Sequence, residues 1–371
     1  MNIMNQYISK SDAIQTLIKA LDGEHQNVLL SGVTPSFYAS LMQMLYENKR
    51  RPVVIMMQNL YQAQRLYDQL VELMDEGLVR LFPMDEFITA EMLASSSELR
   101  IERMNTLSSI IEDPNRIIVT HVAGAARFLP PKEVFQQADI SLEVGECYDL
   151  DTLKRKLIEL GYQSVRAVEH MGEFSVRGGI LDVFPMTEEN PLRIEFFDDE
   201  IDTIRYFTTD TQRSIKKVER AVIVPTFELV YSDQEIKAFE SSIKDLLNKT
   251  LPLVDGEARE MLYARIYQDI EKIQNHQDLE LMHKYISLLY KDPDTLLSYL
   301  DNPLVIYIDY ARVLENQEHM NEDALAWQEG AIENGKTVKG LNLYQPITTI
   351  SVAHQLFLSE HLGTLPNVEL D

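Results

Sequence analysis

One loop of the chain has the position of a phosphate-binding loop but lacks the residues that phosphate binding requires. It begins at Gly32, directly after the apolar run at 27–31, and a stretch with helical spacing follows it. This strand–loop–helix arrangement is the setting of the Walker A motif, which needs a second glycine, a lysine and a hydroxyl residue. Phe37, Tyr38 and Ala39 occupy those three positions. The sequence therefore predicts a degenerate loop that binds no ATP.

A second remnant of a nucleotide site follows the apolar run at 304–308. Asp309 stands where the acid of a Walker B motif would hold magnesium, but Tyr310 replaces the glutamate that would polarise water. An aspartate alone is more often a strand-end residue than a metal ligand. Two incomplete halves of one site indicate a shared origin with ATPases and a lost ATPase activity.

Residues 330–337 match the spacing of a phosphate-binding loop as text, with Gly330, Gly335, Lys336 and Thr337 at the motif positions. The residues before them, 323–327, have helical character, whereas the motif requires a preceding strand. We interpret this segment as a helix that ends at Glu333, with Gly335 as its C-terminal cap.

No other group of residues has the spacing of a catalytic or metal site. His276 and His283 do not follow the HExxH pattern of zinc enzymes. The acidic residues within 198–202 are typical of a solvated strand end. The sequence predicts no catalytic residue, no metal and no cofactor.

Residues 174–197 predict two strands around a turn, and one face of this pair has the composition of a protein-binding site. Along 192–197 apolar and other residues alternate, so Arg193 and Phe197 share one face. Arg177 lies nearby if the strands pair. An arginine beside an exposed aromatic residue is typical of a binding hot spot. Two ordinary surface arginines and a core phenylalanine would give the same pattern.

The order of the elements predicts an α/β protein with an inserted domain. Strands alternate with helices up to residue 125, which indicates a parallel sheet covered on both faces. A β-rich segment follows, and after residue 213 the chain is helical again, with helices expected at 232–248, 257–274 and 279–290. We expect a β-rich domain at 126–213, inserted into an α/β domain made of residues 1–125 and 214–371.

Composition restricts the classes of function. The chain has 371 residues, which suggests more than one domain, and 45% hydrophobic residues, enough for real cores. Its net charge of −25 disfavours tight DNA binding by the surface as a whole. The single Cys147 excludes an internal disulfide and fits a reducing compartment. No apolar run is long enough to span a membrane.

The strings VRGGILDVFP, LRIEFFDDEID and TQRS resemble the second domain of the nucleotide-excision-repair protein UvrB. They resemble the matching domain of transcription-repair coupling factors more closely still. This resemblance implies docking onto the damage-recognition protein UvrA, with Arg177, Arg193 and Phe197 at the family's contact positions. It also implies a discontinuous, degenerate helicase-like (RecA-like) parallel α/β domain, with an inserted α+β domain like the second domain of UvrB.

UvrB has an aromatic hairpin that clamps DNA, whereas the matching residues here, 82–93, are few and poor in tyrosine. This departure favours the coupling factor. The family then implies that a polymerase-binding domain and an ATP-dependent DNA translocase motor lie beyond Asp371. RNA polymerase and DNA would be contacted only through those parts, and the protein would be bacterial and cytoplasmic.

The expected function is therefore a non-enzymatic protein-binding module that recruits UvrA to stalled RNA polymerase for nucleotide excision repair. One alternative is a divergent UvrB-like DNA-repair helicase subunit, which Tyr38 and the missing hairpin argue against. Another is a structural or autoinhibitory module that packs on the translocase motor of the same protein. The resemblance makes this last alternative plausible as well.

Overall fold

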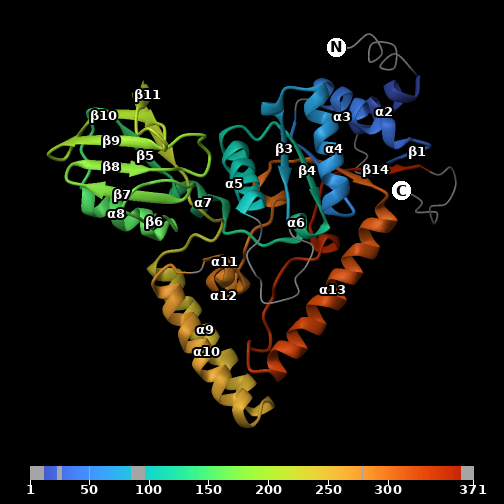
Figure 1. Ribbon diagram of the computed structural model, residues 1–371. Coiled ribbons are helices and arrows are strands. Elements are labelled where there is room, and N and C mark those ends of the chain that lie inside the picture. The colour runs from blue at the N-terminus through green and yellow to red at the C-terminus, as the bar shows by residue number, and fades with distance from the viewer. Residues whose placement is uncertain (1–11, 23–26, 50, 85–96, 278, 361–371) are drawn as a thin grey trace. The chain divides into compact units, whose positions relative to one another are not determined.

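The computed structural model (Figure 1) describes residues 12–22, 27–49, 51–84, 97–277 and 279–360. These residues fall into two compact units. Unit 1 takes its described residues from 1–128, 294–327 and 344–371. Unit 2 consists of residues from 129–293 and 328–343. The chain thus leaves the first unit and returns to it twice, so the predicted discontinuous arrangement is confirmed.

Unit 1 is built on a parallel sheet with the strand order β1-β14-β13-β2-β4-β3. The strands are β1 (Asn27–Ser31), β2 (Val53–Met57), β3 (Val79–Phe82), β4 (Ile117–His121), β13 (Leu304–Ile308) and β14 (His354–Ser359). The central strands β13, β2 and β4 are buried along their whole length, as expected of apolar runs in a sheet covered on both faces. Because β13 and β14 lie between β1 and β2, the C-terminal segment completes the sheet.

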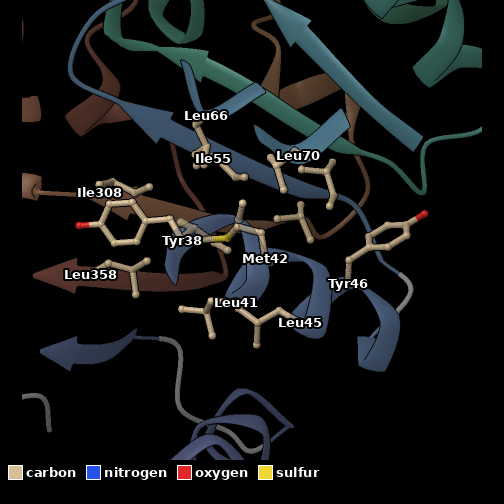
Figure 2. Close-up of a cluster of buried hydrophobic side chains, with 14 of the residues drawn as sticks. Tyr38, Leu41, Met42, Leu45, Tyr46, Ile55, Leu66, Leu70, Ile308 and Leu358 are labelled. Carbon is tan, nitrogen blue, oxygen red and sulfur yellow. The ribbon is translucent and has the colours of Figure 1, made fainter. Parts of the chain in front are cut away.

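The helices of unit 1 each follow a strand, except the first, which precedes β1. They are α2 (Asp12–Asp22), α3 (Pro35–Lys49), α4 (Leu60–Leu73), α5 (Ser97–Glu112), α6 (Val122–Ala126) and α13 (Tyr310–Glu333), of which the last runs on into unit 2. Side chains of α2, α3 and α4 form one core with alternate residues of the sheet. Figure 2 shows part of this core, in which Leu41 and Met42 of α3 lie near Ile55, Ile308 and Leu358 of three strands.

Unit 2 contains a second sheet of different character, with the order β11-β10-β9-β8-β7-β6. Its strands are β6 (Gln163–Ser164), β7 (Glu173–Arg177), β8 (Ile180–Val183), β9 (Leu192–Phe197), β10 (Glu200–Phe207) and β11 (Ser214–Val218). All neighbours pair antiparallel except β6 and β7. A separate two-stranded sheet joins β5 (Ile140–Glu143) to β12 (Arg220–Ile223), and α7 (Lys132–Ala138) and α8 (Leu150–Glu159) complete this part. The predicted β-rich α+β insertion is thus confirmed as a fold.

The boundary expected at residue 213 is corrected by strand pairing. β11 begins at Ser214 and forms an antiparallel ladder with β10, and β12 pairs with β5. A domain that ended at 213 would leave the hydrogen-bonding edge of β10 without its partner strand. Residues 214–223 therefore belong to the β-rich part. The helices that follow, up to residue 293, also group with unit 2 rather than with the parallel sheet.

Those helices are α9 (Asp233–Thr250), α10 (Gly256–Gln274), α11 (Leu279–Met282) and α12 (Ile286–Leu289). Short 3-10 turns occur at η1 (Glu76–Leu78), η2 (Leu251–Leu253), η3 (His283–Tyr285), η4 (Leu297–Tyr299) and η5 (Ile347–Thr349). The helical stretch expected at 279–290 is present, but it is not one continuous α-helix, because the 3-10 turn η3 interrupts it. Lys284 and Tyr285 of η3 both reach the buried Asp269 of α10, at 2.9 and 2.7 Å. None of the helices in the described residues is long and apolar enough to cross a membrane.

Candidate protein-binding site

Two strands of unit 2, with β8 between them, carry the residues that the sequence singled out. Arg177 ends β7, while Arg193 and Phe197 lie on β9. Leu192 and Ile194 are fully buried, whereas the residues that alternate with them are more exposed, so the two faces of β9 are those predicted. Arg177 pairs with Ile180 of β8, and Ile180 pairs with Glu195 of β9, which lies between Arg193 and Phe197. All three candidate residues therefore lie on one face of one sheet.

A buried carboxylate joins the two arginines. Asp182 of β8 lies directly opposite Arg193 of β9 and is only 2% exposed. Its Oδ1 accepts a hydrogen bond from Arg193 Nε at 2.6 Å, and its Oδ2 accepts one from Arg193 Nη2 at 2.8 Å. The same Oδ2 accepts from Arg177 Nη2 at 2.7 Å. One carboxylate thus holds two guanidinium groups, and the cluster carries a net charge of +1.

Two further contacts, with Phe207 and Gln212, hold the Arg193 side chain in place. Its guanidinium carbon lies 4.4 Å from the centre of the Phe207 ring, within the range of a cation–π contact. Its Nη2 also donates to the side-chain oxygen of Gln212 at 2.8 Å. Gln212 has a φ of 57° in the turn between β10 and β11. The hydrogen bond to Asp182 raises the pKa of Arg193, which is therefore cationic at every physiological pH.

The two arginines differ in accessibility. The Arg193 side chain is 16% exposed, whereas that of Arg177 is 54% exposed. Arg177 is consequently the more accessible charge for a partner, and Arg193 is largely a component of the sheet surface. The alternative interpretation of two ordinary surface arginines does not fit Arg193.

Phe197 is the most conspicuous apolar side chain of this face. It ends β9 next to the turn at Asp198 and is 80% exposed, the largest exposed fraction among the large apolar side chains that the structure describes. An aromatic ring in this state gains nothing from the fold itself, because its apolar surface remains in water. It is available to insert into a pocket of a partner.

The basic character of the face extends across the sheet. One cross-strand row runs Ser175, Asp182, Arg193, Arg205 and Lys217, from β7 to β11. Arg205 forms an ion pair with Glu195, which lies between Arg193 and Phe197 along β9. This concentration of arginine and lysine contrasts with the strongly acidic chain as a whole.

Reasoning from the sequence missed Asp182 and Gln212. The signal for Asp182 is present, since it alternates with the apolar Leu181 and Val183 and must therefore face the same way as the arginines. Its pairing with Arg193 depends on the register of β8 and β9, which the sequence does not give. No local signal points to Gln212, because its role depends on the turn conformation.

The degenerate phosphate loop lies at the other candidate site, in unit 1. Tyr38 and Ala39 of α3 are both about 5% exposed, and Tyr38 belongs to the apolar core of the unit. Figure 2 shows the Tyr38 ring between Ile308 and Leu358, at the ends of two neighbouring strands. Burial and the nearby charges of Glu360 and Asp309 raise the pKa of Tyr38 to about 12. A neutral phenol thus stands where a phosphate-binding loop would place a lysine.

Asp309 and Tyr310 lie where the sequence placed the second half of that site. Asp309 follows β13 with a φ of 55° and pairs with Arg312 at 3.2 Å. Tyr310 packs against Tyr307 and Phe357, with ring centres 5.1 and 5.0 Å away. The acid is paired with an arginine of the helix that follows it, and the position of the missing glutamate belongs to an aromatic cluster.

A comparison with known protein families decides what the β-rich part is. Residues 140–229 match the model of the UvrB interaction domain. These residues form a UvrB interaction domain. The match runs from β5 to beyond β12 and includes Arg177, Asp182, Arg193 and Phe197. It also extends past residue 213, in agreement with the boundary that strand pairing gives.

The chain as a whole is related to transcription-repair-coupling factors. It is 33% identical over 345 residues to that of Bacillus subtilis (strain 168), and 30% identical over 345 residues to that of Staphylococcus haemolyticus (strain JCSC1435). Each match covers 92% of this chain and 29% of the relative. The factor of Staphylococcus aureus (strain Mu50 / ATCC 700699) is 28% identical over 337 residues. The chain therefore spans less than a third of the length of these relatives.

The text match to a phosphate-binding loop at 330–337 lies outside the UvrB interaction domain and is a helix end. The Gly335 N–H donates to the Ile332 carbonyl at 3.0 Å and the Lys336 N–H to the Ala331 carbonyl at 2.7 Å. This pair of bonds after α13, with a φ of 65° at Gly335, is the Schellman motif. A Cβ at Gly335 would also lie 2.1 Å from the Ala258 carbonyl oxygen. The interpretation of this segment as a capped helix is confirmed.

The described residues contain no group of three or more histidine, cysteine or acidic residues arranged to hold a metal ion. Within the UvrB interaction domain, Asp198 to Asp202 occupy the β9–β10 turn and the start of β10. Outside it, His276 stacks on Tyr231 and His283 contacts Phe227 edge-on. The residues that match the aromatic hairpin of UvrB, 82–93, lie mostly outside the described residues, which leave out 85–96.

Proposed function

We propose that this chain is a protein-binding module of a transcription-repair coupling factor and that it recruits UvrA through the UvrB interaction domain. The exposed Phe197, on the same sheet face as the fixed arginine pair, is the observation that carries the proposal. The full-length coupling factor would link this recruitment to stalled RNA polymerase, so that excision repair begins where transcription has stopped.

The chemistry of the face suits protein recognition. Arg177 keeps most of its N–H donors for a partner, and a guanidinium can bind a carboxylate with two parallel hydrogen bonds. Phe197 adds apolar area on the same face of the sheet. Aromatic and arginine side chains together are the residue types that dominate binding energy in protein interfaces.

The proposal includes the absence of an ATPase in this part of the protein. Tyr38 occupies core space at the start of α3, and Asp309 is engaged by Arg312. An ATP-dependent motor and the contacts with RNA polymerase and DNA would belong to other parts of the longer protein.

The test is a calorimetric titration of purified UvrA with the whole chain and with an Arg177→Ala/Phe197→Ala double variant. We expect saturable binding by the parent chain and a loss of at least about thirtyfold in the double variant. Saturable binding that the double variant retains in full would place the UvrA contact elsewhere. Absence of binding by the folded parent chain would refute the function itself.

A further inference from the structure

The hydrogen bonds of the buried Asp182 indicate a role in binding as well as in the fold. We propose that Asp182 is a positioning residue of the UvrA-binding face, which fixes the guanidinium groups of Arg177 and Arg193 before the partner arrives. The proposal rests on the proposed function for its partner, and on the described contacts for its mechanism.

Asp182 cannot itself be a contact residue for a partner, since it is 2% exposed. Its Oδ1 takes one hydrogen bond and its Oδ2 takes two, all within 2.6–2.8 Å and all from the two arginines. Every hydrogen bond that the structure gives this side chain therefore goes to a residue of the candidate face. A buried carboxylate with only cationic partners determines where those cations lie.

The remaining donors of the arginines are the part that a partner can reach. A guanidinium has five N–H donors. Asp182 and Gln212 together take the Nε and Nη2 donors of Arg193, which leaves its Nη1 group. Arg177 gives one hydrogen bond to Asp182 through Nη2 and is half exposed. Asp182 thus binds both guanidinium groups on the side that faces the sheet. Their remaining N–H donors are left for a carboxylate of the partner.

This arrangement favours an acidic partner segment. Two arginines around one aspartate leave an excess of one positive charge, and Lys217 continues the same cross-strand row. Long side chains that are already ordered lose less conformational freedom when a partner binds, so fixing them in advance increases affinity. Asp182 would contribute to binding in this way without touching the partner.

A purely structural role for Asp182 is the competing explanation, because loss of any buried ion pair can loosen a sheet. Asp269 of α10 offers a matched control. It is also a fully buried carboxylate, and it bonds to Lys284 and Tyr285, away from the binding face. Asp269→Asn removes a comparable buried charge while leaving the arginine pair intact.

The experiment compares the whole chain with its Asp182→Asn and Asp269→Asn variants. UvrA affinity is measured by calorimetry, and the mobility of arginine side chains by nitrogen relaxation of their Nε–H groups, with the exposed Arg213 as a mobile reference. We expect Arg193 to be rigid in the parent and mobile in Asp182→Asn, with an affinity loss of about tenfold or more. Asp269→Asn should lower the melting temperature but leave both readouts unchanged.

Three results would overturn the proposal. The first is an Arg193 Nε–H in the parent chain that is as mobile as that of Arg213, a measurement that needs no variant. The second is unchanged arginine mobility and affinity in Asp182→Asn. The third is an equal affinity loss in Asp269→Asn, which would make lost stability the cause. If the parent chain does not bind UvrA, the proposed function fails, and the arginine mobilities alone decide whether Asp182 orders them.

Discussion

Asp182 and Arg193 face each other across β8 and β9 and form a bidentate ion pair, with both hydrogen bonds between 2.6 and 2.8 Å. Because of this ion pair, the three candidate residues have different roles. Arg193 is built into the sheet surface, whereas Arg177 and Phe197 extend from it. Substitutions at these positions should therefore affect stability and binding in different proportions.

Arg177→Ala should separate binding from stability. We expect UvrA affinity to fall about thirtyfold, which corresponds to about 2 kcal/mol. The free energy of unfolding should change by no more than about 0.5 kcal/mol, since the side chain is half exposed and Arg193 still pairs with Asp182. Calorimetric titration and urea denaturation measure the two quantities. An unaltered affinity would remove Arg177 from the binding site.

Arg193→Ala should reduce both the affinity for UvrA and the free energy of unfolding. Removing this side chain leaves the buried Asp182 with Arg177 as its remaining cation and uncovers Phe207. We expect a loss of about 2–3 kcal/mol in the free energy of unfolding, together with weaker UvrA binding. Urea denaturation followed by circular dichroism tests the first part. A variant as stable as the parent would show that the ion pair contributes nothing to the fold.

Phe197→Ala should weaken UvrA binding by about thirtyfold without loss of stability. The alternative interpretation of a core phenylalanine would give the ring a structural role, but a side chain that is 80% exposed has little packing to lose. Melting curves and a UvrA titration give the two readouts. A variant that melts several degrees lower would contradict the exposed position of the ring.

ATP should not bind to this chain. Tyr38 is buried at the start of α3, and Lys336 belongs to a helix cap rather than to a phosphate loop. Equilibrium dialysis with ATP and magnesium is the measurement, with Lys336→Ala as the companion variant. Micromolar binding that disappears in Lys336→Ala would restore the text match at 330–337 as a nucleotide site.

Stability should decline between pH 6.5 and 4 in part because of His121. Burial lowers the pKa of His121 to about 4, and its Nε2 accepts the Met84 N–H at 3.1 Å. The unfolded chain takes up a proton near pH 6.5 while the folded chain does not, so the stabilising contribution is lost as the pH falls. The full difference corresponds to about 3 kcal/mol.

A His121→Gln variant should show a flatter decline over the same range in urea denaturation. Asp139 increases stability as the pH falls, because burial raises its pKa to about 6. This effect is the same in the parent and in the variant, so it cancels in the comparison. Parallel pH profiles for parent and variant would exclude His121 as the source.

The sequence by itself determined the elements and the faces of this protein. Apolar runs such as 53–57 and 304–308 predicted the buried parallel strands, and alternation along 192–197 placed Arg193 and Phe197 on one face, because side-chain direction follows from local periodicity. Phe37, Tyr38 and Ala39 marked the phosphate loop as degenerate for a similar reason, since the motif depends on residue types at fixed spacing.

Only the tertiary structure decided which residues meet and how far each is exposed. The register of β8 against β9 placed Asp182 between the two arginines, and the β10–β11 pairing moved the domain boundary beyond residue 213. Burial of Arg193, exposure of Phe197 and the interruption of the helix at η3 also depend on contacts between distant segments. Pairing register and burial are properties of several segments at once, so local patterns do not fix them.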